Sequence, residues 1–148
     1  MSPVTAPRTG KGRGTRARLL VAARQQTLAN GGTLEVATVA EAAGVVPSVV
    51  YRYFGSKAGL VTALIDDFFD RFHERVLDVD LREHGSWAQR ERRRLESGVR
   101  FHYEEPLAVV IYALLAREPQ VAWHIASARA RSSRRRRGTS ATASGAAS

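Results

Sequence analysis

The chain has 148 residues, a formal net charge of +9 and no cysteine. A chain of this length can bury one sizeable hydrophobic core or two small ones, and the lack of cysteine excludes a disulfide framework and a thiolate metal site. No apolar run approaches the roughly 20 residues that cross a bilayer, and the basic amino terminus lacks the apolar segment of a secretory signal. We therefore expect a cytoplasmic protein that does not enter a membrane.

The positive charge lies at the two ends of the chain. Residues 1–24 and 126–148 each carry six basic residues and no acidic residue, whereas residues 25–125 carry 11 basic and 14 acidic residues, a net charge of −3. Basic ends attract DNA phosphates without regard to base sequence. The same composition also fits solvated tails, so both interpretations stay open.

The amino-terminal part of the chain predicts a leader followed by one helix. Residues 1–14 have too little apolar surface to fold alone, and we expect a flexible basic leader there. From Thr15 to about Asn30, apolar residues recur at helical spacing and predict the first helix, which two glycines end before a short connector at residues 35–37. The apolar side of this helix comprises Leu19, Leu20, Ala23 and Leu28.

Residues 38–57 fit two short helices joined by a tight turn. Thr38 and Glu41 have the capping-box spacing, with a hydroxyl at the helix start and a carboxylate three residues later. Gly44 suits a turn with positive φ, and Pro47 suits the first turn of a second helix because its missing N–H would be unpaired there in any case. This arrangement predicts a helix-turn-helix, whose second helix can lie in a DNA major groove.

The same segment resembles the DNA-binding domain of the TetR-type (tetracycline repressor-like) bacterial transcription regulators. The matching residues are Thr38-Val-Ala-Glu-Ala-Ala-Gly-Val45, Val50-Tyr-Arg-Tyr-Phe-Gly-Ser-Lys57 and Leu60, and with the preceding helix the resemblance covers about the first half of the chain. It implies an all-α protein, with a three-helix DNA-binding domain over residues 15–60 and a helical regulatory and dimerisation domain over residues 61–128. One position departs from the family pattern, since Val46 stands where a small hydroxyl residue usually caps the second helix.

The resemblance also implies which residues contact DNA. The expected phosphate contacts are Thr38, Tyr51, Tyr53 and Lys57. Helix starts present free N–H groups to phosphates, although both tyrosines fit equally well as half-buried packing residues. The expected base contacts lie on the outer side of the second helix, namely Pro47, Ser48, Val49 and Arg52. Arg52 can pair with guanine O6 and N7 or hold a phosphate, while Val50 and Phe54 face inward.

Ser56 and Lys57 are expected to open a fourth helix with a broad apolar stripe that further protein must cover. The stripe comprises Leu60, Leu64, Phe68, Phe72 and Val76, widened by Val61, Ile65 and Phe69. In the resembling family this helix links the DNA-binding and regulatory domains.

Three more helices are predicted after a polar loop. The first, residues 87–105, has a charged middle and an apolar trace of Trp87, Leu95, Val99 and Phe101. The second, residues 107–117, follows Pro106 and is apolar on nearly all sides, which is typical of a buried helix. The third begins at Pro119 and runs through Val121, Trp123 and Ile125.

Regulators of the resembling type usually carry a small-molecule pocket. The candidate lining residues are Phe68, Phe72, Trp87, Phe101, Tyr112 and Trp123, with His102 and His124 as polar anchors. An aromatic stripe at helical spacing also builds an ordinary core, so both interpretations stay open.

No bulky apolar residue occurs after about Ala126. Residues 129–148, rich in Arg, Ser and Ala, therefore fit a disordered tail. Members of the resembling family normally continue with two long helices that form the dimer interface, and the sequence has no trace of them. We therefore expect a chain that is truncated at its carboxyl end, in which the helices near residues 107–115 and 121–125 pair instead or cause aggregation.

The helix-turn-helix pattern predicts a sequence-specific DNA-binding protein. The resemblance implies a regulator of transcription, a repressor relieved by a small-molecule ligand, that binds a palindromic operator in double-stranded DNA as a homodimer. Neither a cofactor nor a metal is expected. Catalysis is not expected either, because the four histidines lack metal-binding spacing and no nucleophile or phosphate-loop motif occurs. The alternative is a truncated regulator fragment that is non-functional or depends on a partner, and that binds DNA only non-specifically through its basic ends.

Overall fold

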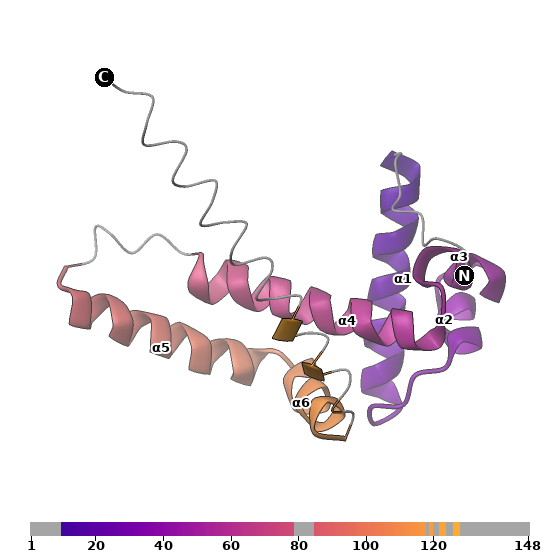
Figure 1. The fold of residues 1–148 in the computed structure, drawn as a ribbon. Helices are drawn as coiled ribbons and strands as arrows, with labels where there is room; N and C mark the ends of the chain where they lie inside the picture. Colours follow the sequence, from indigo (N-terminus) through magenta and orange to yellow (C-terminus); the bar gives the residue numbers. More distant parts are fainter. Residues whose placement is uncertain (1–9, 79–84, 118, 120–121, 124–125, 128–148) are drawn as a thin grey trace. The chain divides into compact units, whose positions relative to one another are not determined.

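The computed structural model describes residues 10–78, 85–117, 119, 122–123 and 126–127. Within these residues the chain is all-α and has no strand, which confirms the predicted fold class (Figure 1). The elements are α1 (Gly10–Ala29), α2 (Val36–Ala42), α3 (Pro47–Phe54), α4 (Lys57–Phe72), the π-helical turn η1 (His73–Leu77), α5 (Trp87–Glu104) and α6 (Leu107–Arg117). No helix in this described part is long and apolar enough to cross a membrane.

The chain divides into two compact units, Met1–Ala113 and Leu114–Ser148. The first contains α1 to α5 and most of α6. In the second, the described residues after α6 (119, 122–123 and 126–127) are helical. The predicted tail at 129–148 lies outside the described residues, as do His124, Val121 and Ile125.

Helix α1 begins at Gly10, five residues before the predicted start at Thr15. The central turns are fixed by Leu19 and Ala23, both fully buried. Once such turns are packed, adding one more residue costs little because each also gains a backbone hydrogen bond. The glycine-rich and basic residues before Thr15 therefore continue the helix although they bury little.

The predicted capping box at Thr38 and Glu41 is wrong. Helix α2 begins at Val36, its N-cap is Glu35 without a side-chain cap bond, and Thr38 is already inside the first turn. The Val39 N–H donates to the Glu35 carbonyl at 3.1 Å. The helix starts early because Val36, 6% exposed, packs into the core together with Val39, so hydrophobic burial rather than a hydroxyl cap sets the boundary.

The turn between α2 and α3 matches the prediction. Gly44 has a φ of 68°, and the Val45 N–H donates to the Ala40 carbonyl at 2.9 Å, which satisfies a carbonyl at the end of α2. Pro47 occupies the first turn of α3, whose N-cap, Val46, makes no side-chain cap bond. The small core around this motif comprises Leu19, Leu20, Ala22, Ala23, Leu34, Val36, Val39, Ala40, Val50, Phe54, Leu60 and Ala63.

Helices α3 and α4 meet at a tight joint. Helix α4 opens at Ser56 and Lys57 as predicted, and the Ser56 hydroxyl caps it by accepting a hydrogen bond from the Gly59 N–H at 3.0 Å. A Cβ atom at residue 59 would overlap the Phe54 carbonyl oxygen, so only glycine lets the first turn of α4 approach the end of α3 this closely. The orientation of α3 is thereby tied to α4.

The apolar stripe of α4 is buried as predicted. Leu60, Leu64 and Phe68 are at most 1% exposed and Val76 is 3% exposed, while Phe72 is half-buried. The stripe packs against α1 and α3 near its start, and α5 runs back beside α4 and η1 (Figure 1).

The predicted apolar trace of α5 is wrong for three of its four residues. Phe101 is buried, but Trp87, Leu95 and Val99 are exposed. Leu95 and Phe101 are six residues apart, which places them about 120° apart around an α-helix, so a narrow buried face does not include both. Helix α6 is also only partly buried, because Leu107 and Ile111 face the core whereas Val109 is exposed.

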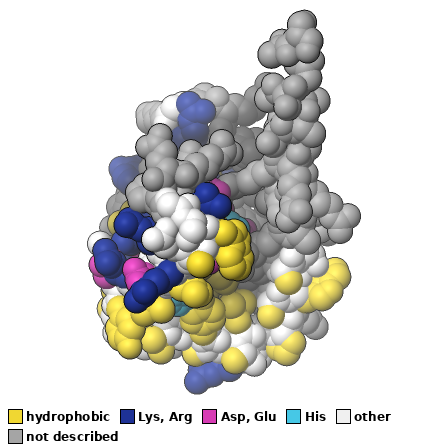
Figure 2. Space-filling model, turned by 90° about the vertical axis from the view of Figure 1, so that its left-hand side faces the viewer, with side chains coloured by type: hydrophobic (Ala, Val, Ile, Leu, Met, Phe, Trp, Pro, Cys, Tyr) yellow, Lys and Arg dark blue, Asp and Glu magenta, His cyan; other side chains and the backbone are white. Residues whose placement is uncertain are grey.

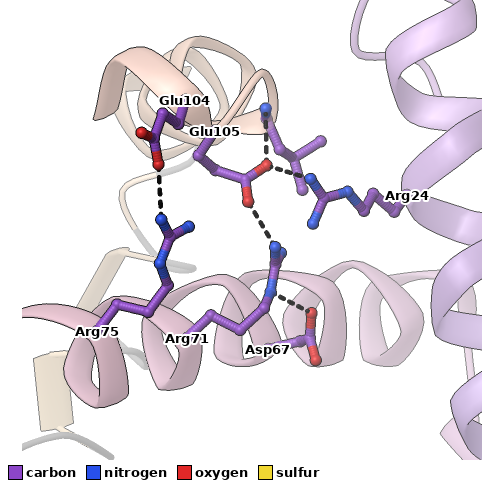
Figure 3. Close-up of polar contacts among 7 residues, drawn as sticks. Arg24, Asp67, Arg71, Arg75, Glu104 and Glu105 are labelled. Carbon is purple, nitrogen blue, oxygen red and sulfur yellow. Dashed lines mark hydrogen bonds and ion pairs between the residues drawn. The ribbon is translucent and has the colours of Figure 1, made fainter. Parts of the chain in front are cut away.

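A buried carboxylate joins α1, α4 and the α5–α6 junction. Glu105 is 4% exposed, and one of its oxygens accepts from Arg24 of α1 at 2.6 Å while the other accepts from Arg71 of α4 at 2.5 Å (Figure 3). The same carboxylate accepts the Leu107 N–H at 3.2 Å and so caps α6. Its neighbour Glu104 pairs with Arg75 at 2.6 Å on the surface.

These adjacent glutamates give a matched test of what burial adds to an ion pair. Glu105→Gln is expected to lower the free energy of unfolding by about 2–3 kcal/mol, because it leaves two arginines without their carboxylate in a partly buried site. Glu104→Gln is expected to cost less than about 1 kcal/mol, since both members of its pair are half-exposed. Urea denaturation followed by circular dichroism measures both; equal costs would contradict the central role of Glu105.

Candidate nucleic-acid interface

The outer surface of α3 carries most of the predicted base-contacting residues. Pro47, Ser48 and Arg52 are exposed, while Val50 and Phe54 on the opposite side are buried in the core. This division follows from the helical period, since Val50 and Phe54 lie four residues apart and point the same way. The structure therefore leaves all three predicted residues accessible, with Ser48 and Arg52 on the outer face of α3 and Pro47 at its start.

Two predicted contact residues of α3 are partly engaged in packing. Val49 and Tyr53 are half-buried against the core, and the Arg52 guanidinium lies over the Tyr53 ring at 5.5 Å from its centroid. Tyr51 is 48% exposed. Of the two tyrosines, Tyr51 is thus the more accessible. The Tyr53 ring holds the Arg52 side chain in place through a cation–π contact.

The flanking residues lie at the starts of α2 and α4. Thr38 is half-buried in the first turn of α2. Lys57 is the first residue of α4, and its ammonium pairs with Glu35 at the start of α2 at 2.8 Å. Both side chains of this pair are at least half-exposed, so solvent or a phosphate can compete for Lys57.

The Lys57–Glu35 pair was not predicted from the sequence. The two residues are 22 positions apart, and no local pattern links a connector residue to a helix start that far away. The same holds for Arg16 of α1, whose guanidinium lies over the Phe54 ring at 5.4 Å from its centroid and so joins α1 to the end of α3.

Away from this face, an aromatic cluster fills the space between α4, α5 and α6. Phe68 and Phe72 of α4 lie 5.5 and 5.3 Å from the Phe101 ring of α5, and Tyr112 of α6 packs edge-on to Phe68 at 6.1 Å. Four predicted pocket residues therefore belong to one cluster, linked through Phe68 and Phe101. Trp87, at the start of α5, is 70% exposed and outside the cluster; Trp123 belongs to the second unit.

His102 supplies the polar edge of this cluster. Its ring stacks on Tyr112 at 5.5 Å, with Nδ1 2.6 Å from the Gly98 carbonyl oxygen and Nε2 2.6 Å from the Tyr112 hydroxyl. A carbonyl oxygen only accepts, so Nδ1 carries a hydrogen and donates it to Gly98. Within the described residues, no group of three or more His, Cys, Asp or Glu side chains is arranged to hold a metal ion.

Comparison with known proteins identifies a family to which part of this chain is similar. Residues 19–64 match the family model described as bacterial regulatory proteins of the tetR family, a span that runs from Leu19 in α1 through α2 and α3 into the middle of α4. No curated protein and no solved structure matches the chain. The helix-turn-helix domain of this chain is thus similar to that of the tetR family of bacterial regulatory proteins, which confirms the resemblance that its sequence motifs indicated.

Proposed function

We propose that the protein represses transcription by binding a palindromic operator in double-stranded DNA as a homodimer, in the cytoplasm, and that a small-molecule ligand releases it. The observation that carries this proposal is the division of α3, which exposes Pro47, Ser48 and Arg52 while Val50 and Phe54 anchor it in the core. An anchored helix with a free polar face is the part that such proteins insert into the major groove.

Each part of the face has a proposed role. Arg52 donates to O6 and N7 of a guanine, the commonest specific contact of arginine in the major groove. Pro47 and Val49 contact thymine methyl groups, and Ser48 hydrogen-bonds to a base edge or a phosphate. Tyr51, Tyr53, Thr38 and Lys57 hold the phosphate backbone.

Lys57 has a second part in this scheme because Glu35 already holds it. The pair fixes the starts of α2 and α4 relative to each other, and a phosphate replaces Glu35 as the partner of the ammonium when DNA binds. The exchange costs little, since exposed ion pairs are weak. Phosphate contacts of this kind position the reading helix without specifying sequence.

Ligand release is proposed to act through the aromatic cluster. Phe101 and Glu105 are one helical turn apart, and the Glu105 N–H donates to the Phe101 carbonyl at 2.9 Å. A small aromatic molecule that inserts between Phe72, Phe101 and Tyr112 would displace the end of α5. Glu105 would then move relative to Arg24 and Arg71, which changes how α1 and α4 hold α3.

Release by ligand can be tested once an operator is known. Small aromatic compounds are screened for loss of the protein–operator complex. Active compounds are retested on Tyr112→Ala, a half-exposed position, after circular dichroism has shown that this variant keeps the helical fold. At least a tenfold loss of potency is expected, because the substitution removes one wall of the site. Unchanged potency would place the ligand elsewhere.

The basic ends support a second candidate function, non-specific DNA binding by a regulator that is otherwise non-functional or depends on a partner. Each end carries six basic residues without an acidic one. Such ends bind phosphates in a strongly salt-dependent way and distinguish no sequence.

Selection from a random DNA library at near-physiological salt distinguishes the two candidates. The full chain and a variant without residues 127–148 are compared. Enrichment of one two-fold symmetric site by both proteins is expected, because α3 and not the carboxyl-terminal arginines reads the bases. Retention of DNA without any preferred sequence, lost when the arginines are removed, would favour the second candidate.

The role of Arg52 is tested on the selected site. Arg52→Ala is expected to weaken operator binding by roughly 5- to 150-fold, about 1–3 kcal/mol, and to weaken binding to unrelated DNA much less. Arg93→Ala is the control, because it removes the same charge from an exposed position of α5. Fluorescence anisotropy at fixed salt gives both affinities, and equal losses on the two DNAs would identify Arg52 as a phosphate contact.

A further inference from the structure

Helix α5 carries an apolar stripe on its outer side. Leu95, Val99 and Tyr103 are spaced four residues apart and are 70%, 58% and 89% exposed. Side chains at this spacing lie on one side of a helix, and here that side faces away from Phe101, through which α5 packs. Scattered exposed hydrophobic residues need no explanation, but a contiguous stripe of large ones marks an association surface.

Charges of both signs border this α5 stripe. Arg92 and Glu96 form an exposed ion pair at 3.2 Å along one edge, and Arg100 is exposed one turn beyond Glu96. On the face drawn in Figure 2, hydrophobic side chains gather next to basic and acidic side chains. An edge with alternating charges can match itself when it is reversed, which an edge of a single sign cannot do.

We propose that the α5 stripe is the contact between two copies of this chain, which pair through it in antiparallel fashion about a two-fold axis. The axis passes near Val99, so that Val99 packs on its own counterpart and Leu95 of one copy packs on Tyr103 of the other. In a two-fold interface one surface meets itself, which requires self-complementarity. The reversed edge provides it, because Glu96 of one copy comes opposite Arg100 of the other.

These charges indicate that the α5 stripe binds a second copy of the chain. A membrane surface favours a helix whose polar face is uniformly basic, whereas this stripe is bordered by an arginine already paired with a glutamate. The inference rests on the proposed function in one respect only, which is that a two-fold operator needs two reading helices. Since three apolar side chains per copy make a small interface, a dissociation constant on the order of micromolar is expected.

The test uses the full chain in sedimentation velocity over a range of concentrations without DNA. Val99→Glu is expected to raise the dimer dissociation constant at least tenfold, because it places a carboxylate on the two-fold axis opposite its own counterpart. Val109→Glu is the matched control, since Val109 is an exposed valine on α6 outside the stripe. Circular dichroism checks that both variants keep the helical fold.

Charge reversal tests the antiparallel register. Glu96→Arg and Arg100→Glu are each expected to weaken the dimer, and the double variant is expected to restore it. A monomeric wild-type chain up to about 100 µM, or equal dissociation by Val99→Glu and Val109→Glu, would overturn the proposal. Binding of the monomeric chain to anionic vesicles, lost in Val99→Glu, would overturn it in favour of a membrane surface.

The same data separate this inference from the proposed function. If the wild-type chain forms a dimer that Val99→Glu weakens but selects no operator, two copies pair through the α5 stripe and the proposed binding to an operator is contradicted. If the chain selects a two-fold site and Val99→Glu leaves its dimer unchanged, the proposed binding to an operator is supported and the α5 stripe is not the dimer contact.

Discussion

The Glu105 carboxylate is bound from three directions, and the arrangement of the first unit depends on it. Arg24 reaches it from α1, Arg71 from α4, and the start of α6 donates a backbone N–H. A buried carboxylate is costly unless opposite charges and hydrogen bonds surround it. Here both oxygens are occupied, so α1, α4 and α6 can be brought together only in the geometry that satisfies them. The hydrophobic core stabilises this packing, and Glu105 selects which packing it is.

This constraint defines the route by which a change in α5 or α6 can reach α3. The end of α3 is held by the Gly59 joint with α4 and by Arg16 of α1 over Phe54. Glu105 joins the same two helices, α1 and α4, through its ion pairs. A shift of the α5–α6 junction therefore acts on both supports of α3 together. Packed helices respond to such a shift by moving between discrete arrangements and not by continuous bending.

Local patterns in the sequence predicted the elements whose cause is local. Pro47, Ser56 and the four-residue spacing of α4 each act within one or two turns, and all three were confirmed. The predictions failed where packing against distant residues determines the structure. Burial of Val36 moved the start of α2, and the side on which α5 packs leaves Leu95 exposed. Glu105 and Arg24 are 81 positions apart, and nothing in the sequence around either one indicates the other. The contacts of α3 with DNA stay predictions, because the exposure of a side chain does not identify the group that it binds.

The α5 stripe and the Glu105 contacts place different demands on one helix. The inner side of α5 carries Phe101 and His102, in contact with the aromatic cluster, and the outer side carries the stripe. If two copies pair through the stripe, the spacing of their α3 helices is set by the path from the two-fold axis through α5, Glu105 and α4. Two-fold operators require a spacing of about 34–36 Å. A molecule that moves the inner side of α5 away from α4 then changes that spacing in both copies at once. A displacement too small to unfold either copy is therefore enough to misplace the two α3 helices relative to the operator.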